Sequence, residues 1–207
     1  MAYLSKEDLE YIKTYDDSKY EKPSVTADVI CFCVPEGTCE PPKVLMIRRG
    51  GFPYKGCFAF PGGYAEKGEA IDDTARRELL EETGISDIPI KQMRVYSRPG
   101  RDPRGWVVTT AFLAILKGEP ITAIGGDDAA EAVWCEVSWR DVSEDKREIV
   151  LSGGGTKLRY TVDVFRTGPI PEGEGRPRFL EGEDCPLAFD HGEVLADALC
   201  RLEEELS

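Results

Sequence analysis

Three glutamates on one predicted helical turn have the residue type and spacing to do chemistry. Glu78, Glu81 and Glu82 stand at i, i+3 and i+4, so their side chains share one face of a helix. Such crowded like charges destabilise an isolated helix unless a hard divalent cation neutralises them. Mg²⁺ takes oxygen ligands, holds few carboxylates and bridges to substrate phosphates. The pattern predicts a magnesium site, with a solvated acidic helix face as the alternative.

The helix that positions these glutamates is expected over residues 71–83. Its opposite face should anchor it to a sheet through apolar side chains, namely Ile71, Ala75, Leu79 and Leu80. Gly84 stands where a helix C-terminus favours a left-handed residue. The glycines that precede the helix allow a backbone carbonyl to approach the same ion.

The glutamates belong to a longer pattern that runs from Gly63 to Ile85. Five residues separate Gly63 from Glu69, seven more lead to Arg77, and RELLEETGI completes the segment. This segment closely resembles the signature box of the Nudix hydrolase family. The resemblance implies an α/β fold, an α/β/α sandwich on a mixed sheet. It also implies Mg²⁺- or Mn²⁺-dependent hydrolysis of a nucleoside diphosphate linked to another group.

The resemblance also implies roles for single residues. Glu78 and Glu82 would be the main metal ligands, and Glu81 a further ligand or the general base. Arg77 would orient the glutamates through ion pairs, and the carbonyl of Gly62 is a candidate ligand.

Two more acids have roles by the same resemblance. Glu131, expected in a loop before a strand, would supply a further metal contact or the general base. Glu69 would be a structural acid, and Asp127 and Asp128 are interpreted as turn residues.

The segment SRPGRDPRGW (97–106) holds the candidate phosphate contacts. Arginine forks suit bidentate contacts with phosphate, so Arg101 and Arg104 are candidate substrate-binding residues. The alternative is that both arginines form salt bridges with Asp102 and hold the loop together. If one arginine is structural and the other faces the substrate, both interpretations are satisfied. Arg48 and Phe52 are further candidate substrate contacts. Phe52, Tyr54 and Trp106 could stack on adenine or lie in the core, and the core is favoured for Trp106.

Four segments resemble the ADP-ribose pyrophosphatase branch of the family: KYEKPSVTADV (19–29), RDPRG (101–105), GGDDAAEAVW (125–134) and AFDHGEVLADAL (188–199). They imply cleavage of ADP-ribose to AMP and ribose 5-phosphate. Alternative substrates are NADH, another nucleotide sugar or an oxidised nucleotide. A different class is an ADP-ribose-sensing transcription regulator with a winged helix. The intact box, the acidic charge and the predicted hairpin, loop and single helix after Val137 argue against it.

Composition sets the remaining limits. The 207 residues are 41% hydrophobic and 31% charged, as in a globular chain, and the net charge of −13 disfavours nucleic acid and anionic membranes as partners. No apolar run approaches the roughly 20 residues that span a bilayer, and the polar N-terminus is unlike a signal peptide. The seven cysteines form no CxxC pair and are interpreted as small hydrophobes. We expect a cytoplasmic protein.

The chain is expected to form one Nudix domain over residues 1–207. Its additions would be an N-terminal helix and arm (1–24), a hairpin and loop insertion (143–185) and a C-terminal helix (190–206). Ser5 and Asp8 predict a capping box. Strands are predicted at 25–34, 43–49, 90–97, 106–116 and 131–137, with hairpins over 25–49 and 146–165 and an exposed loop over 167–177.

Two further expectations concern assembly and the single histidine. The resemblance implies a homodimer, for which the N-terminal helix and strand 25–34 are the candidate interface. His191 falls at the start of the last helix, where a structural role is favoured over catalysis.

Overall fold

The computed structural model describes residues 4–126, 129–164, 178–181 and 187–207. The helices are α1 (Lys6–Thr14), α2 (Ile71–Thr83) and α3 (His191–Leu206). The strands are β1 (Ser24–Val34), β2 (Lys43–Arg49), β3 (Phe58–Ala59), β4 (Gly62–Tyr64), β5 (Lys91–Tyr96), β6 (Val107–Lys117), β7 (Ala129–Ser143), β8 (Lys146–Gly153), β9 (Thr156–Asp163) and β10 (Arg178–Glu181).

One mixed sheet carries these strands in the order β10-β9-β8-β7-β2-β1-β6-β5, with β3 paired to β2 and β4 to β1. β1 and β6 run parallel, and the other pairs are antiparallel. On its other edge β1 pairs with β2 at Phe32 and Cys33 and with β4 between Thr26 and Asp28. Because β2 and β4 share this edge of β1, Gly62 and Gly63 of β4 lie opposite Asp28 and Ala27 of β1.

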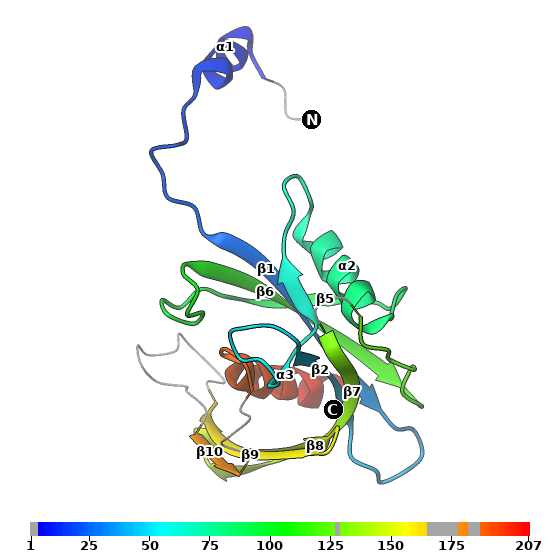
Figure 1. Ribbon diagram of the computed structural model, residues 1–207. Coiled ribbons are helices and arrows are strands. Elements are labelled where there is room, and N and C mark those ends of the chain that lie inside the picture. The colour runs from blue at the N-terminus through cyan, green and yellow to red at the C-terminus, as the bar shows by residue number, and fades with distance from the viewer. Residues whose placement is uncertain (1–3, 127–128, 165–177, 182–186) are drawn as a thin grey trace.

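The side chains of β1 point alternately to the two faces of the sheet, and each face carries its own core layer. Ile30 and Phe32 pack in the cluster that includes α3, whereas Val29 and Cys31 pack in the cluster that includes α2. The two helices therefore cover opposite faces of the sheet (Figure 1). This confirms the expected α/β/α sandwich on a mixed sheet.

Helix α2 has the predicted bounds, and Gly84 ends it at φ 70°. The prediction for Leu80 is wrong, because this side chain is exposed. The buried residues of α2 are Thr74, Ala75, Leu79, Glu82 and Thr83. Leu80 lies outside this buried stripe, because each residue of a helix is rotated about 100° from the one before it.

The C-terminal part extends the same sheet. The predicted hairpin forms from β8 and β9, but it pairs with a β7 that continues to Ser143, beyond the predicted end of that strand. Leu195, Leu199 and Leu202 of α3 are buried as expected, whereas Leu206 is exposed. The predicted loop over 167–177, and Asp127 and Asp128, lie outside the described residues.

The N-terminal helix α1 has the predicted capping box of Ser5 and Asp8 and buries none of its residues. It stands away from the sheet (Figure 1). Strand 25–34 does not fit the expected dimer interface, because β1 is an interior strand of the sheet. Trp106 is 55% exposed, so the core interpretation of this residue is wrong. Within the described residues, no helix is long and apolar enough to cross a membrane.

Candidate metal and diphosphate site

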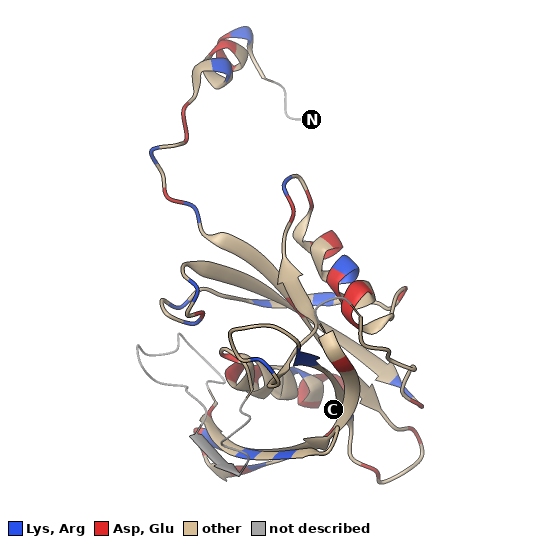
Figure 2. Cartoon of the chain, in the orientation of Figure 1, with Lys and Arg blue, Asp and Glu red and all other residues tan. Residues whose placement is uncertain are grey.

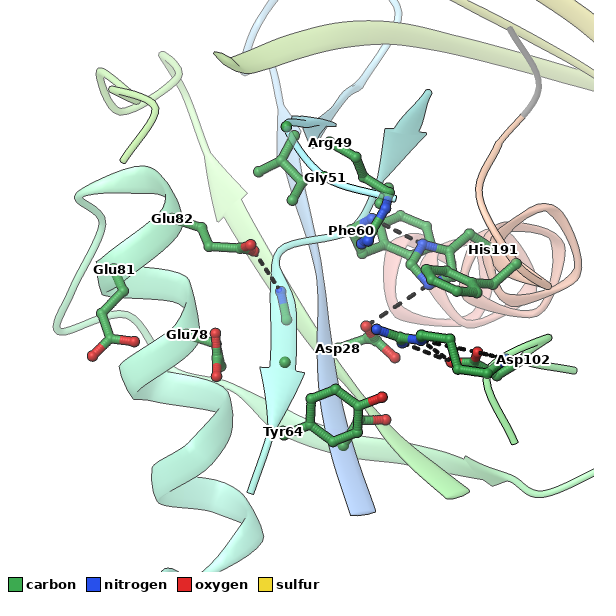
Figure 3. Close-up of a pocket in the computed structure, with 18 of the residues that line it drawn as sticks. Asp28, Arg49, Gly51, Phe60, Tyr64, Glu78, Glu81, Glu82, Asp102 and His191 are labelled. Atoms are coloured by element: carbon green, nitrogen blue, oxygen red, sulfur yellow. Dashed lines mark hydrogen bonds and ion pairs between the residues drawn. The ribbon is translucent and has the colours of Figure 1, made fainter. Parts of the chain in front are cut away.

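A cavity of about 550 Å³ opens between α2, β4 and the start of α3. Figure 3 shows the glutamates of α2 on one side of β4 and His191 and Asp102 on the other. The residues that line it include Asp28, Arg49, Phe52, Phe60, Gly62, Gly63, Tyr64, Arg77, Glu78, Glu81, Glu82, Arg101, Asp102, Arg104, Phe189 and His191. The structure therefore brings together all three helical glutamates and both candidate arginines of the 97–106 segment, Arg101 and Arg104.

Three carboxylates form one wall of this cavity, which we call the acidic wall: the buried Glu82, the half-buried Glu78 and the exposed Glu81. Figure 2 shows the dense charge on α2 beside a largely uncharged β1. Glu82 accepts a hydrogen bond from the N–H of Gly62 at 2.8 Å. Burial raises the pKa of Glu82 to about 8, and the charges of Glu78 and Asp28 add to the rise. Burial also raises the pKa of Glu78. The two carboxylates thus resist carrying their charges without a cation.

Arg77 is the guanidinium that holds this wall together. It donates to Glu78 at 2.7 Å, to Glu81 at 3.0 Å and to both oxygens of Glu69 at 2.9 and 3.0 Å. Hydrogen bonds from Arg77, and from the backbone of Glu66 and the hydroxyl of Thr74, lower the pKa of Glu69 to about 2. Among the described residues, Glu82 has no salt-bridge partner.

The acidic wall fits a hard divalent cation. Its donors are all oxygens, and a side chain at Gly63 would come within 2.5 Å of the Glu78 carboxylate, so only glycine leaves this space open. Within the described residues, no three acidic, histidine or cysteine side chains already form a metal cage. Mg²⁺ does not require one, because it binds through one or two carboxylates and completes its shell with water and substrate oxygens.

The opposite wall is built from arginines that each have their own acid. Arg101 forms two hydrogen bonds, at 2.8 and 2.6 Å, with Asp190, and both side chains are 4% exposed. Arg104 pairs with Asp102 at 2.7 Å and stacks over the rings of Tyr64 and Phe189. The alternative in which both arginines bind Asp102 is therefore wrong, because Arg101 binds Asp190 instead. Arg101 fastens its loop to the start of α3, and Arg104 is the more exposed of the two.

The same pairing changes the interpretation of the last helix. Asp190 stands at the N-cap of α3, a position that its residue type favours, but its side chain makes no capping hydrogen bond. Its carboxylate binds the Arg101 guanidinium instead.

Arg48 and Glu131 do not line the cavity. Glu131 lies within β7, not in the expected loop, because it pairs with Arg48 of β2. Arg48 donates to Glu131 at 3.2 Å and to the carbonyls of Gly56 and Gly154. Arg49, the next residue along β2, does line the cavity. Successive strand residues face opposite sides, so this alternation is the signal that could have selected Arg49.

Three further cavity residues had no predicted site role: Asp28, Phe189 and His191. Asp28 is the one acid within the otherwise apolar or hydroxyl-bearing stretch SVTADVICFCV. A lone charge in a buried strand is a signal that sequence reasoning could have used. Phe52 lies at the cavity with 85% of its surface exposed.

The chain belongs to the Nudix family, since the NUDIX domain model matches residues 22–151. It is 43% identical over 96 residues to the ADP-ribose pyrophosphatase of Methanocaldococcus jannaschii, which is 46% of this chain and 56% of that protein. The match spans about half the length of the curated relatives.

Two solved structures are also similar. A MutT/nudix family protein from Enterococcus faecalis superposes with a TM-score of 0.72 and 34% identity, over 96% of this chain and 69% of that one. The NUDIX domain of Shewanella oneidensis NrtR, complexed with ADP ribose, superposes with a TM-score of 0.54 and 25% identity, over 63% and 82%.

Proposed function

We propose that this chain is a Mg²⁺-dependent hydrolase that cleaves the diphosphate of ADP-ribose to AMP and ribose 5-phosphate. The observation that carries this proposal is the acidic wall, where the half-buried Glu78 and the buried Glu82 have raised pKa values beside a cavity. Arg49 and Arg104 line the same cavity and can meet the phosphate oxygens. The relative from M. jannaschii is named for ADP-ribose hydrolysis.

Glu78 and Glu82 would hold Mg²⁺, or Mn²⁺ as the alternative ion, and the Gly62 carbonyl is a candidate third ligand. The bound ion supplies neutralisation of phosphoryl charge and a more acidic water. Arg77 keeps Glu78 and Glu81 in place through its two hydrogen bonds.

Glu81 is our choice for the general base. Of the two candidates it lines the cavity, and Glu131 does not. Its carboxylate is 42% exposed, so it can accept a proton from water and pass it to solvent.

The test is Mg²⁺-dependent hydrolysis of ADP-ribose beside NADH, ADP-glucose and an oxidised nucleoside triphosphate, with products identified. We expect AMP and ribose 5-phosphate to form fastest, and no turnover in EDTA. Faster cleavage of another compound would keep the chemistry and replace the substrate. No cleavage of any of them would contradict the proposal.

Similarity to the NrtR domain favours one other function, an ADP-ribose-responsive regulator. The described chain after β7 speaks against it, because β8, β9 and β10 extend the sheet and α3 packs into the core. The net charge of −13 also opposes DNA binding. A gel shift on promoter DNA that is lost with salt would support the regulator.

We also propose a homodimer that uses the N-terminal arm. Exposed apolar residues on and near α1 support this proposal: Leu4, Leu9, Tyr11, Ile12 and Tyr15. Sedimentation of the chain with and without residues 1–20 should show a dimer that the deletion dissociates. An unchanged mass would contradict this role of the arm.

A further inference from the structure

Asp28 and His191 place a hydrogen-bond acceptor and a donor side by side at the cavity. Both residues line it, at 9% and 3% exposure. Asp28 Oδ1 lies 3.8 Å from His191 Nε2, which is too long for a direct hydrogen bond. Figure 3 shows the pair on the side of β4 away from the α2 glutamates.

The hydrogen bond at the other ring nitrogen determines which group His191 presents. Nδ1 accepts the N–H of Phe60 at 2.9 Å, and the ring stacks on Phe60 with centroids 5.0 Å apart. Burial lowers the pKa of His191, so the ring is neutral at pH 7. In a neutral imidazole that accepts at Nδ1, the proton is on Nε2. His191 therefore offers an N–H donor toward Asp28.

Asp28 offers an acceptor. Its Oδ2 accepts the hydroxyl of Thr109, which fixes the carboxylate. Among the described residues, Oδ1 of Asp28 and Nε2 of His191 have no hydrogen-bond partner. Gly62 permits this placement, because a side chain there would come within 2.6 Å of Oδ1.

The ligand group that satisfies both atoms is a hydroxyl, which accepts from His191 and donates to Asp28. A phosphate oxygen only accepts and would meet the charge of Asp28, and an ammonium only donates. We propose that Asp28 and His191 bind a hydroxyl of the sugar on the distal phosphate, so that the site selects nucleoside diphosphates linked to a sugar. This inference rests on the proposed function.

The exposure of the lining residues supports a sugar beside Asp28 and His191. Phe52, 85% exposed, and Tyr64, 42% exposed, give the cavity an aromatic surface on which a base can stack. Asp28 and His191 are buried, which suits the smaller, hydroxyl-rich group. A site built to hydrogen-bond a hydroxyl strongly rejects ligands that lack it, because its polar groups are then left unpaired.

Binding of two non-hydrolysable ligands tests the proposal: ADP-ribose with a methylene bridge between its phosphates, and the matching methylene analogue of ADP. We expect the wild-type protein with Mg²⁺ to bind the first about tenfold more tightly, which corresponds to about 1.4 kcal/mol. Asp28→Asn should lower that ratio, because a neutral amide oxygen accepts a weaker hydrogen bond than a carboxylate, and should leave binding of the ADP analogue nearly unchanged. Asp197→Asn is the matched control, since Asp197 is a half-buried acid bound to Tyr96 and Arg94 and does not line the cavity.

A second pair of variants covers the case in which Asp28→Asn does not fold. His191→Asn can keep the acceptor for Phe60 and removes the Nε2 donor, whereas His191→Gln can place a donor near Nε2. We expect the ratio to fall in His191→Asn and to fall less in His191→Gln. A wild-type ratio near one, or a ratio unchanged in Asp28→Asn and His191→Asn, would overturn the proposal. Absence of ADP-ribose hydrolysis with the ratio intact would overturn the proposed function and leave this inference standing.

Discussion

The two walls of the cavity use charge in opposite ways. On the acidic wall Glu78 and Glu81 share one guanidinium with Glu69, and Glu82 has no salt-bridge partner in the described chain. On the opposite wall Arg101 binds Asp190 and Arg104 binds Asp102.

This difference distinguishes charged side chains that stabilise the fold from charged side chains that need a ligand. A buried charge with its own partner is satisfied, and removal of that partner costs stability. A buried cluster of like charges with too little opposite charge destabilises the fold until a ligand supplies the opposite charge. The balance of charge therefore indicates function better than the presence of charged residues, and it predicts different results for variants in the two walls.

The largest effect on stability should come from Arg101→Leu. This change leaves the Asp190 carboxylate buried without its partner, which typically costs about 3–5 kcal/mol. Urea unfolding measures the loss. A loss below about 1 kcal/mol would show that the pair does not hold the 101–104 loop to α3.

Glu82→Gln should have the opposite result, an effect on activity without a loss of stability. Turnover of ADP-ribose should fall by roughly 10²–10³-fold, the range typical of removing one electrostatic catalytic group. The metal-free protein should unfold no more easily, because glutamine has the same size, can accept the Gly62 N–H and removes the cost of burying an ionisable carboxyl group. Steady-state kinetics and urea unfolding are the measurements. Rates near wild type would exclude Glu82 as a metal ligand.

Arg104→Gln should have a moderate effect on binding. Its guanidinium is partly exposed and lines the cavity, so loss of a charge-assisted contact should raise KM about tenfold. Stability should also fall, because Asp102 is buried and loses its partner, but by less than in Arg101→Leu, since Arg104 is partly exposed and glutamine can still donate to Asp102. The contrast with Arg101→Leu sharpens the comparison. Equal destabilisation by both variants would contradict it.

A smaller effect is expected from pH. Burial raises the pKa of Glu82 from 4.5 to about 8, so between these values the folded state holds a proton that the unfolded chain has lost. Stability of the metal-free protein should therefore fall as pH rises through this range. Urea unfolding in EDTA at pH 5 and pH 8 measures the fall. The fall in stability should be smaller in Glu82→Gln. An equal fall in both proteins would show that Glu82 does not cause it.

The acidic wall could be predicted from sequence because it is local. A single helical segment and the glycines before it set the positions of Glu78, Glu81 and Glu82. The helix bounds, the Gly84 end and the β8–β9 hairpin are also consequences of short-range patterns.

The opposite wall could not be predicted in the same way. Arg101 finds Asp190 at a separation of 89 residues, and Asp28 meets His191 across an even longer stretch of chain. Such pairs depend on how β1, the 101–104 loop and α3 are brought together. The position of Arg48 away from the cavity and the exposure of Trp106 could not be predicted for the same reason, because each depends on which side of the fold the residue faces.

Calorimetric titration of the 207-residue chain with Mg²⁺ shows whether the glutamates of α2 bind the ion. We expect binding that weakens more than about tenfold in Glu82→Gln and is unchanged in Asp197→Asn, whose carboxylate already has partners. Equal Mg²⁺ affinity in the wild-type protein and Glu82→Gln would contradict the claim that the glutamates of α2 bind the ion.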